Sequence, residues 1–368
     1  MKKIAKLSLV AAVAVAGLST ANAKPLEEAI KNVDVSGTVV YRYDDRDKDS
    51  SNYTRNSYKI AVNLKSKIND EMTANTRTII GGGKTDMAVL DTNAADSEAA
   101  FALTQANFAY TGIANTTLIA GKQAVPSPFA VQADGAGDED TGTGLTAVVN
   151  AGPATIAATY LNQTNLVTNG ADLAGLGVMA NVGGVALDAW YLDVQETSAT
   201  NDGHQAYTVG AKTKIAPVSL YARYSAVAHD AANTDTESLW KVGAKAKLGM
   251  VGFGVDYGKT NDVTNYQTGV NLTGDADAKV NLQGWALNLN SNDSSLLKVN
   301  VNAAVSKAVK LSANYNTKEA GSVDSKEYYG QVTYKAGKNF MTYLRLGQHK
   351  TDGSDKGTRG RLHVQYSF

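Results

Sequence analysis

The chain has 368 residues, no cysteine, and 35 basic against 35 acidic side chains. The absence of cysteine excludes a disulfide framework, a zinc–thiolate site and a cysteine nucleophile. The balanced charge argues against a nucleic-acid-binding protein, because such proteins carry a basic excess. The 34 glycines and 18 tyrosines suit a chain of many turns and many strands.

The first 23 residues predict an export signal. Three lysines among the first six residues precede an apolar run over 7–18, and Ala21-Asn22-Ala23 follows it. This order is that of a secretory signal with cleavage after Ala23, and the apolar run is too short to span a bilayer. Cleavage leaves a single domain over 24–368 with 32 basic and 35 acidic residues, a net charge of −3.

Beyond the signal, apolar and polar residues alternate with period two through most of the chain. In the first such segment Val35, Val39 and Tyr41 share one face, whereas Ser36 and Arg42 share the other. A strand with one apolar and one hydrated face has this pattern. Long polar stretches and short turns alternate between these segments. The sequence therefore predicts an all-β transmembrane antiparallel β-barrel of about 18 strands, with 16 as the alternative, short periplasmic turns and long external loops.

The predicted connections fall into two length classes. Short turns are expected near 69–71, 112–115, 151–153, 183–184, 216–217, 249–250, 307–308 and 336–338. Long loops are expected at 44–56, 84–98, 127–142, 163–173, 195–204, 228–237, 259–294, 317–325 and 349–357. Residues 279–290 alternate like a strand, but placing them in the wall would put 317–325 on the periplasmic side. We therefore expect 279–290 to lie within the long seventh external loop.

The last strand, 359–368, alternates up to an aromatic end. Leu362, Val364, Tyr366 and Phe368 share its apolar face. This ending resembles the C-terminal signature of outer-membrane barrels, in which the last strand closes the sheet, although an ordinary amphipathic edge strand would show the same alternation. We expect Tyr366 and Phe368 to act as the assembly signal.

The residues on the two faces of the strands predict which face meets lipid and which meets water. One face collects apolar residues such as Val299, Val301 and Leu344, and the other collects polar residues such as Lys298 and Asn300. A Lys or Arg that faces lipid costs about 2–4 kcal/mol at mid-membrane, so the charged face must line the interior. A barrel of about sixteen or more strands is wide enough for an aqueous channel. The pattern predicts a pore for ions and small hydrophilic solutes, surrounded by outer-membrane lipid.

The third external loop, about 124–143, has the features of a pore constriction. Its prolines end strand pairing, its glycines allow unusual backbone angles, and its acids could face basic wall residues across the lumen. Such opposed charges would set a transverse field that selects solutes. The expected constriction residues are Asp134, Asp138, Glu139 and Asp140 on the loop and Arg42, Arg77, Lys122, Arg223 and Arg345 on the wall. Asp134, Asp138 and Asp140 could also supply oxygen ligands to calcium, and a solvated loop outside the barrel is the alternative.

Several segments resemble one family. Residues 25–37, which read PLEEAIKNVDVSG, and Tyr41-Arg42-Tyr43-Asp44 are similar to the mature start of the campylobacterial major outer membrane porin. Residues 119–123, 142–144 and 364–368 resemble that family's third-loop flanks and its ending, whereas 124–140 departs from it and about 160–300 carries no matched motif. The resemblance implies a homotrimeric general porin of about eighteen strands in the outer membrane, which prefers cations and holds calcium near its constriction.

Two other functions are open on the sequence. An outer-membrane hydrolase needs a fixed nucleophile or His–carboxylate pair, and adjacent His229 and Asp230 in a loop do not define such geometry. An adhesin or structural barrel would use its polar loops to bind surfaces. We predict that the chain is not an enzyme and requires no cofactor, with calcium as the candidate ion.

Overall fold

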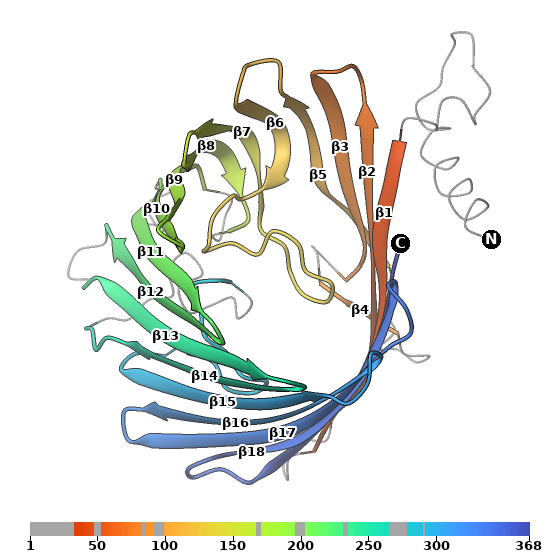
Figure 1. The fold of residues 1–368 in the computed structure, drawn as a ribbon, viewed down its shortest axis with the longest axis vertical. Helices are drawn as coiled ribbons and strands as arrows, with labels where there is room; N and C mark the ends of the chain where they lie inside the picture. Colours follow the sequence, from red (N-terminus) through yellow and green to blue (C-terminus); the bar gives the residue numbers. More distant parts are fainter. Residues whose placement is uncertain are drawn as a thin grey trace.

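The computed structural model describes residues 33–47, 53–82, 86–90, 99–166, 171–195, 203–230, 235–264, 278–289 and 291–368. The expected signal over 1–23 lies outside these residues. Within them, one antiparallel sheet closes on itself as a barrel (Figure 1). The wall strands are β1 (Val33–Asp47), β2 (Tyr53–Lys67), β3 (Met72–Gly81), β5 (Ala100–Tyr110), β6 (Thr116–Ala124), β7 (Thr141–Ala151), β8 (Ala154–Thr164), β9 (Leu173–Val182), β10 (Val185–Val194), β11 (His204–Ile215), β12 (Val218–His229), β13 (Glu237–Leu248), β14 (Val251–Thr260), β15 (Ser294–Ala304), β16 (Val309–Ala320), β17 (Val323–Lys335), β18 (Phe340–Thr351) and β19 (Gly357–Ser367).

The wall therefore has 18 strands among the described residues, which confirms the larger of the two predicted counts. A nineteenth strand, β4 (Ala88–Val89), pairs with β2, while β3 pairs directly with β5, so β4 stands outside the ring. Closure comes from antiparallel pairing of β1 with β19, in which Thr38 lies opposite Ser367. No helix in the described ranges is long and apolar enough to cross a membrane.

The two faces of the wall differ as the alternation predicts. Val301 on β15 is 41% exposed on the outer face, whereas its neighbours Asn300 and Asn302 are hydrogen-bonded to each other on the inner face. Leu344 and Leu346 on β18 are exposed outside, and Arg345 between them points inward to Gln331. So many exposed aliphatic side chains on one face of the wall require an apolar environment, which lipid provides.

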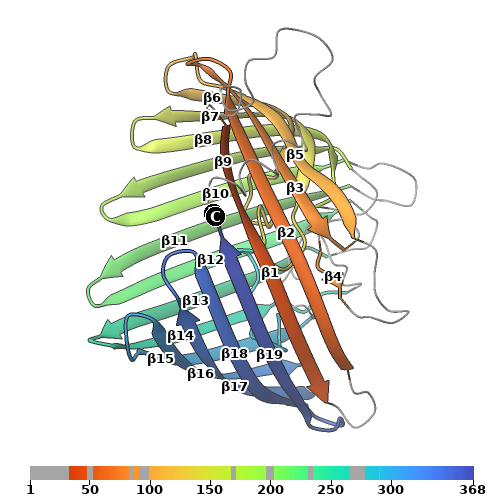
Figure 2. The ribbon, with the colours of Figure 1, turned by 90° about the vertical axis from the view of Figure 1, so that its right-hand side faces the viewer.

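Short turns gather at one rim of the barrel, at the left of Figure 2. The hairpins β7–β8, β9–β10, β11–β12 and β13–β14 lie there, each with a two-residue connection where the sequence predicts a short turn. At the opposite rim the predicted long loop over 317–325 is wrong. β16 and β17 continue to Ala320 and from Val323, and Gly321 joins them with φ of 56°, a left-handed conformation that glycine adopts without strain.

Residues 278–289 lie outside the wall, as predicted, because β15 begins only at Ser294. They do not project away from the barrel, however. Val280 N–H donates to the Pro128 carbonyl of the third loop at 3.3 Å, and the Lys241 ammonium on the inner wall donates to the Asn281 carbonyl. The described part of the seventh loop thus folds into the lumen and meets the third loop there.

An apolar core lies inside the barrel and holds both loops. It joins residues of the third, fourth and seventh loops to the inner face of β8–β13 and β15 near the loop-bearing rim. Its aromatic and leucine members are Phe129, Leu161, Leu166, Leu173, Leu192, Leu239, Leu282, Leu287, Leu289 and Leu296. The predicted charged, hydrated lining therefore does not extend over the whole interior. Burial of these side chains removes apolar surface from water and stabilises the inward position of the loops.

Candidate functional site

The third loop runs from β6 to β7 through the interior of the barrel (Figure 1). Pro126 and Pro128 lack the N–H that ladder pairing needs, so the strand ends at Ala124. Ser127 Oγ accepts a hydrogen bond from the Phe129 N–H at 3.2 Å and fixes the turn that follows. The fully buried Phe129 ring then anchors this arm of the loop in the inner core.

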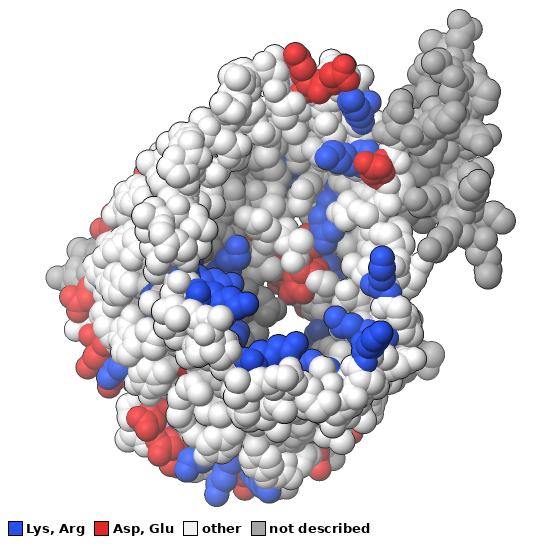
Figure 3. Space-filling view, viewed as in Figure 1, with Lys and Arg blue, Asp and Glu red and all other residues white. Residues whose placement is uncertain are grey.

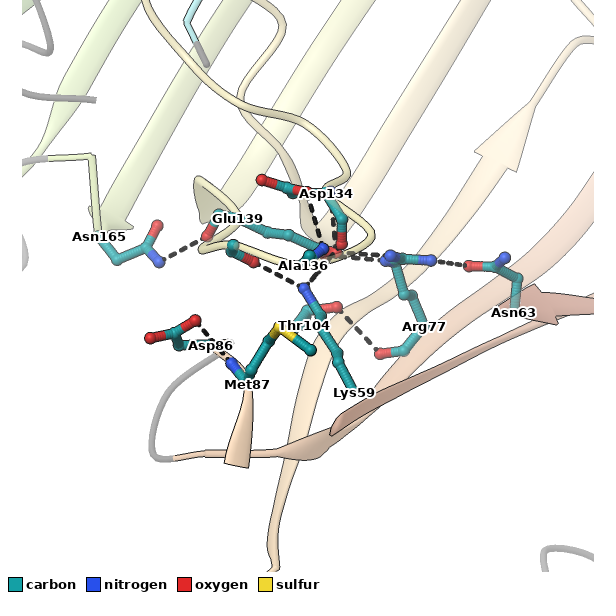
Figure 4. A network of polar contacts seen from close by, with 11 residues as sticks. Lys59, Asn63, Arg77, Asp86, Met87, Thr104, Asp134, Ala136, Glu139 and Asn165 are labelled. Carbon is teal, nitrogen blue, oxygen red and sulfur yellow. Dashed lines mark hydrogen bonds and ion pairs between the residues drawn. The ribbon is translucent and has the colours of Figure 1, made fainter. Parts of the chain in front are cut away.

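The tip of the loop is pinned to the wall by charge. Glu139 is fully buried, and its carboxylate accepts hydrogen bonds from Arg77 on β3, Nε to Oε2 at 2.8 Å and Nη2 to Oε1 at 2.5 Å (Figure 4). The fully buried Lys59 ammonium on β2 lies 3.3 Å from Oε1 of the same carboxylate. It also donates to the carbonyls of Asp134 and Gly137, each at 2.7 Å.

This arrangement satisfies a buried carboxylate and two buried cations together. A two-pronged Arg–carboxylate contact is among the strongest polar interactions in proteins, and each loop carbonyl removes one further unpaired donor of Lys59. Asn63 extends the network, since its Oδ1 accepts from Arg77 Nη1 at 2.7 Å. Glu139 therefore holds the third loop against the wall.

Asp140 also holds the loop together. Its carboxylate accepts a hydrogen bond from the Val131 N–H at 2.7 Å, and its own N–H donates to the Val131 carbonyl at 2.7 Å. Asn165 in the next loop spans the same region, accepting from the Thr141 N–H at 2.6 Å and donating to the Glu139 carbonyl at 2.9 Å. These bonds join the two arms of the third loop to each other and to the fourth loop.

Asp134 and Asp138 are the more accessible acids of the tip. Asp138 is exposed, and half-buried Asp134 accepts from the Ala136 N–H at 2.8 Å. Gly135 lies against the inner wall, because a side chain there would contact Val40 on β1 and Gln365 on β19. Among the described residues, no three His, Cys, Asp or Glu side chains are grouped as a metal site would require. Calcium binding by Asp134, Asp138 and Asp140 stays a prediction without support from this geometry.

A basic surface lies on another part of the wall. Arg223 on β12 donates to Asp188 on β10 at 2.7 Å, and a cavity of about 1040 Å³ extends between this region and the third loop. The charged residues that line the cavity are Asp188, Lys212, Arg223, Lys241, Lys245 and Lys279. Lys and Arg side chains surround the opening on several sides, and acidic side chains face them from one (Figure 3).

A second group of cations lies on β1, β18 and β19. Arg345 pairs in register with Arg361, and Arg361 Nε donates to Asp44 on β1 at 2.6 Å. Arg42 Nε approaches His363 Nδ1 at 3.5 Å. Arg42, Arg77, Arg223 and Arg345 thus point into the lumen as predicted, but they occupy separate parts of the wall, and of these only Arg77 touches an acid of the third loop.

Lys122 does not join them. It lies opposite Ala106 and Thr143, and those positions share the outer face with exposed Phe108 and Leu145. The prediction of Lys122 as a lumenal cation is therefore wrong. Its strand carries an apolar and a polar residue on each face, Leu118 with Lys122 and Ile119 with Gln123, so alternation alone does not show which face turns inward.

Sequence reasoning missed two residues of the lumen. Nothing in the sequence around Lys59 distinguishes it from other lysines on polar strand faces, because its partner Glu139 is 80 residues away. Trp285 lies within the segment assigned to an external loop and contacts Arg345 in the lumen, with the guanidinium carbon 5.2 Å from the ring centroid. The apolar alternation of 279–290 was the available signal that this segment is packed.

A family model matches residues 1–366 of the chain, and its description is Campylobacter major outer membrane protein. The chain belongs to the Campylobacter major outer membrane protein family. This match confirms the resemblance drawn from the N-terminal block and places the protein in the outer membrane, as predicted. It is an outer-membrane protein of this family, built as a closed barrel.

Solved structures share the fold of this Campylobacter family member at low identity. OpdK of Pseudomonas aeruginosa, solved with vanillate, has a TM-score of 0.71 and 11% identity, over 92% of this chain and 99% of that one. OccK5 (OpdH) of P. aeruginosa and OccAB1 of Acinetobacter baumannii each have a TM-score of 0.70 and 13% identity, over 92% of this chain and 98% and 97% of theirs. No curated protein sequence matches the chain.

The histidines do not change this assignment. His204 and His229 lie with ring centroids 5.5 Å apart at the loop-bearing end of β11 and β12, and His229 Nε2 is 3.6 Å from Glu237. His363 stacks on Tyr343 at 4.8 Å inside the barrel. These contacts fix the ends of neighbouring strands and pack the inner wall.

Proposed function

We propose that the protein is a general diffusion porin that passes ions and small hydrophilic solutes, with a preference for cations set at the third-loop tip. The observation that carries this proposal is the placement of an acidic loop tip inside an 18-strand barrel whose inner wall is charged. A barrel of this size encloses water when side chains do not fill it. Loops held inside the lumen narrow the path and set its selectivity.

The balance of charge at the tip supports the cation preference. Asp134, Asp138, Glu139 and Asp140 carry four negative charges there, against two on Lys59 and Arg77 in direct contact with the loop. Because Glu139 is buried and bonded to the wall, and Asp140 is buried and bonded within the loop, Asp134 and Asp138 are the acids that passing ions would meet. The basic surfaces elsewhere on the wall oppose this preference and keep it moderate.

The test is the reversal potential across a KCl gradient for the purified native protein in planar bilayers. Asp134→Asn/Asp138→Asn should lower the ratio of cation to anion permeability relative to the parent. The effect should shrink in concentrated salt, because the screening length falls from about 10 Å at 0.1 M to about 3 Å at 1 M. Asp352→Asn/Asp355→Asn, which removes two exposed acids from another loop, is the matched control.

An unchanged ratio at low salt in the loop variant would remove Asp134 and Asp138 from the selectivity site. An anion preference in the parent would show that the basic wall sets selectivity. A bilayer that conducts no more with the purified protein than without it would refute the porin proposal itself.

The family resemblance also leads us to propose a homotrimer. Separate barrels would then conduct side by side within one complex. Chemical cross-linking in native outer membranes should give a ladder that stops at the trimer, and a ladder that stops at the monomer would contradict this part of the proposal.

A further inference from the structure

Trp285 is held rigidly inside the barrel beside the inner face of β17–β19. The backbone N–H groups of Trp285 and Ala286 donate to the buried carboxylate of Glu327 on β17, at 2.8 and 2.5 Å. Asn316 on β16 donates to the same carboxylate at 2.5 Å. The indole is half-buried and packs against the Tyr329 ring with centroids 5.5 Å apart. The ring is thus presented to the lumen in a fixed position.

Three guanidinium groups converge on this one indole. The guanidinium carbon of Arg345 lies 5.2 Å from the Trp285 ring centroid, and those of Arg359 and Arg361 each lie 6.0 Å from it. Arg345 is also 5.1 Å from the Tyr329 ring centroid and 5.2 Å from that of Tyr343. A guanidinium that lies on aromatic faces directs the N–H groups along its edges toward acceptors in its own plane. Arg359 uses one of them, since its Nη1 donates to the Trp285 carbonyl at 3.1 Å.

The carboxylates nearby do not balance these cations. Asp44 accepts from Arg361 Nε at 2.6 Å, but Glu327 already receives three N–H donors from other groups. Arg345 Nε donates to the neutral Gln331 at 2.8 Å. Within the described part of the chain, Arg359 Nε is buried and has no hydrogen-bond partner. Positive charge and unused donors therefore remain, which is the condition that favours binding of an anion.

We propose that Trp285, Arg345 and Arg359 form a lumenal subsite for small aromatic carboxylates. The carboxylate would take the paired N–H groups of a guanidinium, the geometry for which that group is suited. The flat ring of the solute would pack on Trp285 and Tyr329, as aromatic pairs do. The subsite depends on the proposed porin function only for access, since the solute must enter the lumen to reach it.

Benzoate is the probe, with acetate and chloride as anions that lack the ring. Added to a planar bilayer that contains the native protein in KCl, benzoate should reduce single-channel current in a saturable way, and acetate should do so only at much higher concentration. Arg345→Gln should raise the benzoate concentration for half-block about tenfold, the loss expected for one charge-assisted contact. Lys245→Gln is the matched control, because it removes one lumenal cation from the opposite basic surface.

If Arg345→Gln and Lys245→Gln raise the benzoate concentration for half-block equally, the subsite is overturned, and the total positive charge of the lumen explains the block. Equal block by acetate and benzoate would overturn the aromatic part of the proposal. Arg345→Lys keeps the positive charge but removes the paired N–H donors of the guanidinium, so it should also weaken the benzoate block. If the parent conducts KCl but benzoate produces no block, the subsite fails while the porin proposal stands.

A second measurement follows Trp285 itself. The chain has three tryptophans, so Trp190→Phe/Trp240→Phe leaves Trp285 as the only indole. Titration of this variant with benzoate should change its emission in a saturable way, with a midpoint that matches the half-block concentration. A linear, non-saturating change like that of free tryptophan in solution would overturn the assignment of Trp285 to the site.

Discussion

Gly37 and Phe368 exchange both backbone hydrogen bonds across the seam that closes the barrel. The Gly37 N–H donates to the Phe368 carbonyl at 2.9 Å, and the Phe368 N–H donates to the Gly37 carbonyl at 3.0 Å. The Phe368 ring lies over Gly37 and packs against Tyr366, with ring centroids 6.1 Å apart. The two aromatic residues expected to guide assembly thus complete the contact between the first strand and the last.

Gly37→Ala should weaken this closure. A Cβ at Gly37 would lie 2.3 Å from the Ala61 carbonyl oxygen and 2.7 Å from Cζ of Phe368, so the seam would have to shift. We expect a loss of about 1–3 kcal/mol, seen as a smaller fraction of heat-modifiable folded barrel in unboiled gels. Gly330→Ala is the control, because its nearest atom would be 3.9 Å away. If both variants fold alike, the close packing at the seam is not needed.

Val301→Arg should damage assembly far more than Asn302→Arg. Val301 is 41% exposed on the outer face, and its arginine would meet lipid, whereas Asn302 lies on the inner face beside Asn300. The expected difference is about 2–4 kcal/mol at mid-membrane depth. Urea unfolding in lipid vesicles measures it. Equal midpoints for the two variants would contradict the assignment of the faces.

Glu139→Gln should release the third loop from the wall. The change leaves the fully buried Lys59 without its anionic partner, and breaking a buried ion pair costs about 3–5 kcal/mol. We expect faster proteolysis within the loop and larger current fluctuations in bilayers. Asp138→Asn on the same loop is the control, since Asp138 is exposed.

The double variant Lys59→Met/Glu139→Gln tests whether the unpaired Lys59 ammonium causes the loss of stability in Glu139→Gln. Removing the buried cation together with its partner should recover part of the stability lost in Glu139→Gln, because only Arg77, and no longer Lys59, then lacks an anionic partner next to the loop. If the two single losses simply add in the double variant, Lys59 and Glu139 are not coupled, and the loop is held by its apolar contacts alone.

Local alternation was enough to predict the wall. Each residue in a strand turns its side chain to the side opposite its neighbour's, so period-two patterning gives the faces of Val301 and Asn302 without knowledge of any partner. The short turns at 183–184 and 249–250 follow from glycines between alternating segments. The structure also confirms that 279–289 lies outside the wall. The predicted long loop at 317–325, on which that expectation depended, does not exist, because β16 continues to Ala320 and β17 begins at Val323.

The sequence by itself therefore determined an outer-membrane barrel with a hydrated inner face, and only the tertiary structure decided how the lumen is filled. Which inward lysine meets Glu139 depends on where the third loop crosses to β2, a contact between residues 80 positions apart. The inward fold of 278–289 depends on a core assembled from β8–β13, β15 and three loops. Periodicity records the two sides of one strand, and it carries no information about which distant segments share the same side in space.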